Sequence, residues 1–244
     1  NQAGYNTTGS DNVFIGHEAA YTNTTGHSNT AIGHRVFRSN TTGARCVAIG
    51  LGALDTNTTG DDNTAIGWGT LDAVTTGLRN VAVGNNALTS HTSNYCTAVG
   101  FEAGEDCNAS YNTFIGYQAG LNVTTGTQCV YIGSGAGNVA TTGAQNVFIG
   151  HNIGTNTVTG GRNVFIGYNV QPNEGGDTIF IGAGNKTHTG DYSNNGFMAP
   201  GNSSGSYGGM YQGNNSSTWS TTSDIRIKKN IVDNDIGLKE ILQL

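Results

Sequence analysis

The chain has 244 residues, of which 39 are Gly and 2 are Pro; 11% are charged, and the net charge at pH 7 is −6. Lys and Arg do not cluster before the last 22 residues, which argues against nucleic-acid binding. No apolar run is long enough to span a membrane, and no signal peptide is visible. The apolar residues are regularly phased and charge is sparse, so disorder is not expected either.

The dominant feature is a short phrase that ends in Gly and recurs at a nearly constant spacing. Asn12-Val13-Phe14-Ile15-Gly16 is one copy, and Asn163-Val164-Phe165-Ile166-Gly167 is a late one. Most intervals are 17 residues, and the exceptions are 16, 16 and 15. A fixed period this short predicts an all-β solenoid, a parallel β-roll or β-helix. The closing glycines are Gly16, Gly33, Gly50, Gly67, Gly84, Gly100, Gly116, Gly133, Gly150, Gly167 and Gly182.

Each turn begins with a strand in which Ile or Val stands directly before the closing Gly. Two residues earlier there is Val, Thr or Ile, so these two positions share one face of the strand. We expect that face to line the interior. The residue between them, such as Ala31 or Phe148, should then point to solvent or to a neighbouring chain.

Two further features complete the turn. Three residues after the Gly there is a second apolar position, for example Ala19 or Val36, which we expect to lie in a second short strand. A repeated Thr-Thr-Gly follows, and it is typical of a tight corner in which Gly adopts positive φ. So thin a coil buries little apolar surface, which favours association of three chains.

The position four residues before the closing Gly is usually Asn and in three turns Cys. We expect a ladder of stacked Asn side chains, in which Cys46, Cys96 and Cys129 are small buried substitutes. At about 4.8 Å per turn these cysteines are too far apart for disulfides, so we expect reduced thiols. Only Cys107 lies off the ladder, which leaves a contact with Cys96 or with another chain open. No His has metal-ligand spacing with a Cys, so we predict no metal site and no cofactor.

The organisation changes after the last repeat. Residues 1–182 form the predicted solenoid shaft, and residues 183–222 a Gly-, Ser- and Asn-rich connector with irregular β structure. Charge rises in residues 223–244, where Asp235 and Leu238 mark the start of an amphipathic helix. The chain opens in mid-turn without Met and stops within this helical pattern. We therefore expect a fragment with further turns upstream and a truncated C-terminal domain.

The last segment reads Ser223-Asp224-Ile225-Arg226-Ile227-Lys228-Lys229-Asn230-Ile231 and ends Ile241-Leu242-Gln243-Leu244. It resembles the beginning of the S74 family, the intramolecular chaperone at the C-terminus of phage tail fibres and tailspikes. The shaft resembles the head repeats of trimeric autotransporters, which are left-handed parallel β-rolls, although those repeats are usually shorter.

The resemblance implies that three chains fold together and then cleave themselves before the opening Ser. Carried over, Ser223 is the nucleophile, Lys228 the base, and Asp224 helps to position the scissile bond. A neutral Lys amine can deprotonate a Ser hydroxyl, as in Ser-Lys hydrolases. The alternative is a solvated charged segment that leads into a helix and has no chemistry.

These observations predict a homotrimeric tail fibre or spike of a bacterial virus, which is extracellular and binds a host cell-surface glycan or protein. A cellular surface adhesin or filament subunit is the alternative. A Thr-ladder module for ice or glycan is a third reading, which the Gly after each Thr pair disfavours. We do not expect a conventional enzyme, because the acidic residues are scattered without recurring pairs. The lack of a basic cluster and of a long apolar run argues against nucleic-acid binding and membrane insertion.

Overall fold

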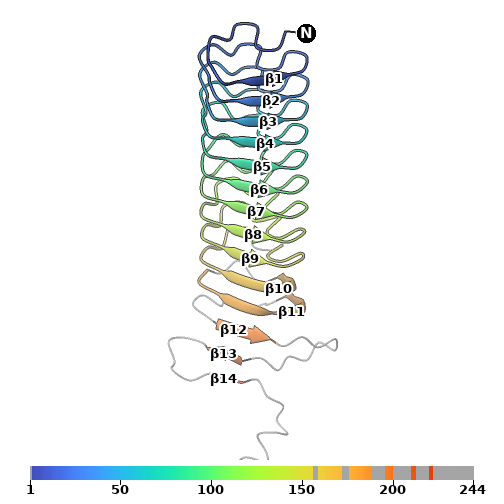
Figure 1. Ribbon diagram of the computed structural model, residues 1–244. Helices are drawn as coiled ribbons and strands as arrows, with labels where there is room; N and C mark the ends of the chain where they lie inside the picture. Colours follow the sequence, from blue (N-terminus) through green and yellow to red (C-terminus); the bar gives the residue numbers. More distant parts are fainter. Residues whose placement is uncertain are drawn as a thin grey trace, which may run out of the picture.

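The computed structural model describes residues 2–155, 159–171, 176–187, 196–199, 210–212 and 220–221. Within them it is a parallel β-solenoid, as the repeat predicts (Figure 1). The first nine strands have 3 residues each. They are β1 Val13–Ile15, β2 Thr30–Ile32, β3 Val47–Ile49, β4 Thr64–Ile66, β5 Val81–Val83, β6 Thr97–Val99, β7 Thr113–Ile115, β8 Val130–Ile132 and β9 Val147–Ile149. The later strands are β10 Val164–Gln171, β11 Ile179–Thr187, β12 Gly196–Ala199, β13 Met210–Gln212 and β14 Ser220–Thr221.

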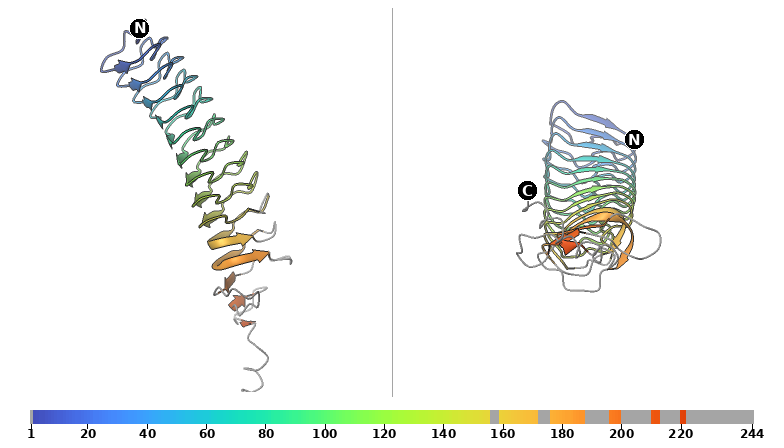
Figure 2. Two further views of the ribbon diagram at one scale, coloured as in Figure 1. Left: turned by 90° about the vertical axis from the view of Figure 1, so that its right-hand side faces the viewer. Right: turned by 90° about the horizontal axis from the view of Figure 1, so that it is seen from below.

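Each strand pairs with the strand of the next turn at the same repeat position. Val13 pairs with Thr30 and Ile15 with Ile32, and the parallel register continues in this way as far as β12. The last two pairings, β12 with β13 and β13 with β14, are antiparallel. The turns therefore stack into one elongated column with the strands along a single side (Figures 1 and 2).

The strand faces are opposite to those expected from the sequence. The middle residues are buried, including Ala31, Phe114 and Phe148, each with an exposed fraction of 0%. The Ile and Val residues on either side of them are half-buried or exposed. Our assignment of Ile and Val to the interior was wrong, because the Asn two residues before the middle residue shares its face and must also lie inside.

The interior is narrow, and its side chains alternate between large and small. The strand middles form one column, the strand-centre column, which is Ala in β2 to β6 and aromatic in β7 to β10. Six residues further along each turn is a second buried position, the opposing column. It holds Phe37, Leu54, Leu71 and Leu88 beside the Ala centres of β2 to β5, and Gly120, Gly137 and Gly154 beside the aromatic centres of β7 to β9. In the turn of Ala98 it is Gly104, because a Cβ there would lie 2.4 Å from the Phe114 ring of the next turn. A Cβ on Gly154 would lie 2.4 Å from the Phe148 ring, so the two columns fill one fixed width.

The second apolar position is buried as expected, but in most turns it does not lie in a strand. Ala19, Val36 and Ala53 have exposed fractions of 0% and lie in hydrogen-bonded turns. Only Val170, at the end of the longer β10, is in a strand. Non-Gly residues beside this position, such as Arg35 and Phe37, have φ values of 52°. The chain therefore turns here with left-handed residues instead of forming a second sheet.

Glycine is required at two corners for different reasons. The strand-closing glycines have φ between 126° and 147°, and a Cβ on Gly50 would lie 2.3 Å from the Gly67 carbonyl oxygen. The Thr-Thr-Gly glycines do not have the positive φ that we expected. At Gly43 the constraint is space, since a Cβ there would lie 2.5 Å from Asn40 Oδ1 and 2.6 Å from the Gly60 oxygen.

The Asn ladder is confirmed, and it links consecutive turns. Asn29 Nδ2 donates to the Gly43 carbonyl at 2.9 Å, and Asn29 Oδ1 accepts from the N–H of Cys46 at 2.9 Å. Cys46 takes over both roles, since its thiol contacts the Gly60 oxygen at 3.4 Å and its sulfur accepts the backbone N–H of Asn63. This is why Cys can replace Asn without breaking the ladder.

Candidate functional site

The feature most suited to function is the exposed side of the strand stack. The first and third residues of β1 to β10 point outward, and we call this surface the outer face. Its third positions are Ile or Val in every turn, and its first positions are Val or Thr. Ile15, at an exposed fraction of 57%, and Ile115, at 39%, show how much apolar surface remains open. Extended apolar surface of this kind is typical of interaction sites, so the outer face is the candidate functional surface.

A second ladder of exposed residues lies directly after the strands, at the position that follows each closing Gly. Members of this ladder include Trp68, Phe101, Tyr117 and Tyr168, all of them exposed. Phe101 stacks on Tyr117 with ring centroids 5.7 Å apart, and His151 on Tyr168 at 5.4 Å. These aromatics extend the apolar surface beyond the strands.

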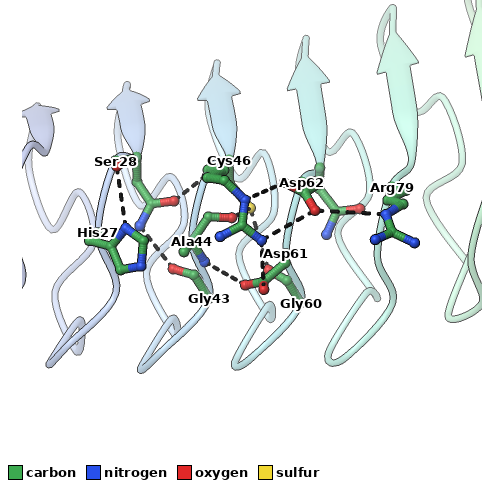
Figure 3. Close-up of polar contacts among 12 residues, drawn as sticks. His27, Ser28, Gly43, Ala44, Cys46, Gly60, Asp61, Asp62 and Arg79 are labelled. Carbon is green, nitrogen blue, oxygen red and sulfur yellow. Dashed lines mark hydrogen bonds and ion pairs between the residues drawn. The ribbon is translucent and has the colours of Figure 1, made fainter.

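Charged residues pair between turns near the Asn ladder. Asp61 and Asp62 lie one turn from Ala44 and Cys46, with Arg79 one turn further (Figure 3). Arg45 reaches Asp61 at 2.9 Å and Asp62 at 2.5 Å, and Asp61 accepts the Ala44 N–H at 2.8 Å. The hydrogen bond from Arg45 lowers the pKa of Asp62. These pairs are solvent-exposed, so they contribute to turn register more than to stability.

The self-cleavage residues predicted from the resemblance lie outside the described part of the chain. The structure therefore does not place Ser223, Asp224 or Lys228 relative to one another. The amphipathic segment from Asp235 onward is also outside it. Self-cleavage therefore stays an expectation that the resemblance implies.

The Thr-Thr pairs lie in bends and not on the strands. The first Thr of the pair is used for stacking, since Thr41 Oγ1 donates to the Thr58 carbonyl at 2.9 Å and Thr58 Oγ1 to the Thr75 carbonyl at 2.9 Å. A hydroxyl that bonds the next turn is not part of a free, flat Thr array. This observation weighs against the ice-binding reading of these pairs.

All four cysteines are free and buried, as expected. The structure nevertheless brings together three residues that the spacing argument kept apart. Ligand atoms of His91, Cys96 and Cys107 all lie within 4.8 Å of one another, and each side chain has an exposed fraction of 0%. The three come from two consecutive turns, so no short sequence spacing reveals them. The sequence feature that could have pointed to this group is turn length, because all three residues lie in the two adjacent turns that have 16 residues.

The environment of the two sulfurs is polar although it is buried. Cys96 Sγ and Cys107 Sγ both contact the Ala109 carbonyl oxygen, at 3.0 and 3.4 Å. A hydrogen bond from Cys96, assisted by His91, lowers the pKa of Cys107. Burial instead raises the pKa of the isolated Cys46 thiol to about 12. The paired cysteines therefore differ chemically from the other two.

Comparison with known proteins does not place this chain in a family. No family model, curated protein or solved structure matches this chain. Within the described residues there is also no helix of the length and apolar character that crossing a bilayer requires. The functional argument therefore rests on the fold and its surfaces.

Proposed function

We propose that this chain forms the shaft of a homotrimeric extracellular fibre, in which three solenoids pack side by side through their outer faces. The observation that carries the proposal is the ladder of Ile and Val that continues along β1 to β10. A half-exposed Ile or Val that becomes buried contributes on the order of 1 kcal/mol. The contribution recurs in every turn, so the whole ladder can offset the loss of freedom on association.

The composition of the surface supports a fibre over an enzyme. The described part of the chain consists of stacked turns, and several arginines pair with an aspartate of the next turn, among them Arg38 with Asp55 and Arg45 with Asp62. A stiff column of this kind suits the display of a binding surface at a distance, and three copies allow weak contacts to a host glycan or protein to act together. We assign it to a bacteriophage tail fibre or spike, with a cellular surface adhesin or filament subunit as the second candidate.

The proposal includes maturation by self-cleavage before Ser223, with Lys228 as base. Loss of a folding chaperone after assembly would trap the fibre kinetically. The intact mass of the full chain, compared with that of Ser223→Ala, tests this step. If the unchanged protein keeps the Thr222–Ser223 bond intact, the step is wrong.

The trimer is tested with charge on the outer face. Ile49→Lys with Ile66→Lys places two cations on adjacent strands β3 and β4. We expect light scattering after size exclusion to give a trimer for the unchanged chain and a monomer for this variant. The matched control is Thr42→Lys with Thr59→Lys, which puts the same charges on exposed bends of the same two turns. A monomeric unchanged chain, or a trimeric Ile variant, would contradict the proposal.

A further inference from the structure

We propose that His91, Cys96 and Cys107 form a metal site for a soft divalent cation of the zinc type, built inside a single chain. Two thiolates and an imidazole are donors that such an ion prefers. Two thiolates also neutralise a 2+ ion, which matters because all three side chains are fully buried. The site does not depend on the trimer or on the outer face.

The first support is the place where the repeat is broken. Gly84 to Gly100 and Gly100 to Gly116 are both 16 residues, one fewer than the usual turn, and both lack the Thr-Thr-Gly corner. His91 and Cys96 belong to the first of these turns, and Cys107 belongs to the second. A repeat protein that departs from its own rule in two adjacent turns, and there gathers three metal-binding side chains, indicates a functional site.

The second support is that two of the ligands occupy the same buried column of the solenoid. His91 and Cys107 are neighbours in the buried corner column, whose other members are Asn23, Asn40, Asn57, Val74, Val123 and Ala140. Only these two of the eight can bind a soft metal through the side chain. Cys96 is the Asn-ladder residue that lies between them in the chain. Cys46 and Cys129 occupy the same ladder elsewhere, but in the described part of the chain neither belongs to a group of three such side chains.

The third support is the hydrogen bonding of His91. One of its ring nitrogens lies 3.0 Å from the Cys107 carbonyl oxygen and the other 3.2 Å from Asn80 Oδ1. Asn80 is oriented by its own bonds, since Oδ1 accepts the Cys96 N–H at 2.9 Å and Nδ2 donates to the Ser93 carbonyl at 3.0 Å. A neutral imidazole has one N–H and one unshared pair. The ring therefore has an oxygen atom beside each nitrogen and also interacts with the Cys107 thiol. In the metal-bound state the unshared pair would bind the cation in place of this thiol contact, after a small rotation of the ring away from the neighbouring oxygen.

The sulfurs also have the outer-shell donors that thiolate ligands use. Asn112 Nδ2 contacts Cys107 Sγ at 3.5 Å, and the backbone N–H of Asn112 hydrogen-bonds Cys96. Binding would displace both thiol protons to solvent, and the Ala109 carbonyl, which contacts both sulfurs, is available as a fourth donor. Because the site is buried, the ion would enter while the chain folds.

The experiment uses the full chain produced in medium supplemented with Zn²⁺ or, separately, with Co²⁺. We expect one ion per chain by elemental analysis, and for Co²⁺ the thiolate charge-transfer and tetrahedral ligand-field bands. His91→Asn, Cys96→Asn and Cys107→Val restore residues that other turns carry at these positions, so they should fold and lose the ion. Circular dichroism checks the fold. The controls Cys46→Asn and Cys129→Asn should keep full occupancy.

Three results would overturn the site. The first is a folded chain without stoichiometric metal under these conditions. The second is a Cys96–Cys107 disulfide in the metal-supplemented protein, seen as a mass that rises by two hydrogens on reduction. The third is unchanged metal content in the His91, Cys96 and Cys107 variants, which would place the ion elsewhere. A monomeric chain that holds the ion would leave this site standing and contradict only the fibre trimer.

Discussion

At the scale of single residues, the fold depends on positions where a side chain has no room. Gly50 combines a φ of 129° with a Gly67 oxygen 2.3 Å from where its Cβ would be. By contrast, Gly52 has a φ of 68° and nothing within 4 Å of such a Cβ. Its equivalents Arg35 and Asn86 are not glycine, at φ of 52° and 55°. The repeat therefore tolerates left-handed side chains where there is room for a Cβ, but not where the backbone of the next turn takes that space.

We expect Gly50→Ala to lower the free energy of unfolding by about 3 kcal/mol or more, because strain and overlap with backbone coincide. The control Gly52→Asn should change it by no more than about 1 kcal/mol. Chemical denaturation followed by circular dichroism measures both. Equal effects of the two substitutions would show that close packing of turns is not the reason for Gly50.

At the scale of the turn, the core depends on complementary sizes in two columns. Phe148 stacks between Tyr131 and Phe165, with ring centroids 4.7 and 4.8 Å away, and Gly154 makes room for it. In the turn of Ala48, the place of Gly154 is taken by Leu54, which has a φ of 53°. The backbone at this position thus accepts Leu, and only the opposing side chain decides between Leu and Gly.

This predicts coupling between the columns. Phe148→Ala should destabilise the protein by about 3 to 5 kcal/mol, and Gly154→Leu by about 1 to 3 kcal/mol through overpacking. The double variant recreates the Ala and Leu pairing, so we expect it to be at least about 1 kcal/mol more stable than the sum predicts. Unfolding midpoints of the four proteins complete the cycle. Additive effects would contradict size complementarity.

At the scale of the molecule, the shaft is a linear stack in which each turn contacts only its neighbours. The pairings run in strict order from β1 to β14. Such a molecule can change length in whole turns, since its stability is close to a sum over repeats and their interfaces. It cannot absorb a fraction of a turn, because every ladder would lose its register.

We therefore expect deletion of residues 51–67, one 17-residue turn, to leave a folded shaft that is shorter by about 4.8 Å. Deletion of residues 51–58 alone should instead disrupt the ladder around β3 and β4. Small-angle scattering reports the length, and circular dichroism reports the strands. A shaft damaged equally by both deletions would exclude independent stacking of turns.

The sequence by itself determined the solenoid, the length of its turns and the Asn ladder, because these follow from periodicity and from where side chains repeat. The structure decided which face is inside. Periodicity places Ile15 and Val13 on the same face of the strand, but it does not say whether that face is inside or outside. In a coil this thin, the interior holds the ladder Asn and the strand residue on the same face as that Asn. The structure alone also brought His91, Cys96 and Cys107 together, since stacking joins residues from successive turns that linear spacing keeps apart. The outward apolar ladder is the feature on which the proposed trimer rests, because it is the apolar surface that the fold leaves exposed.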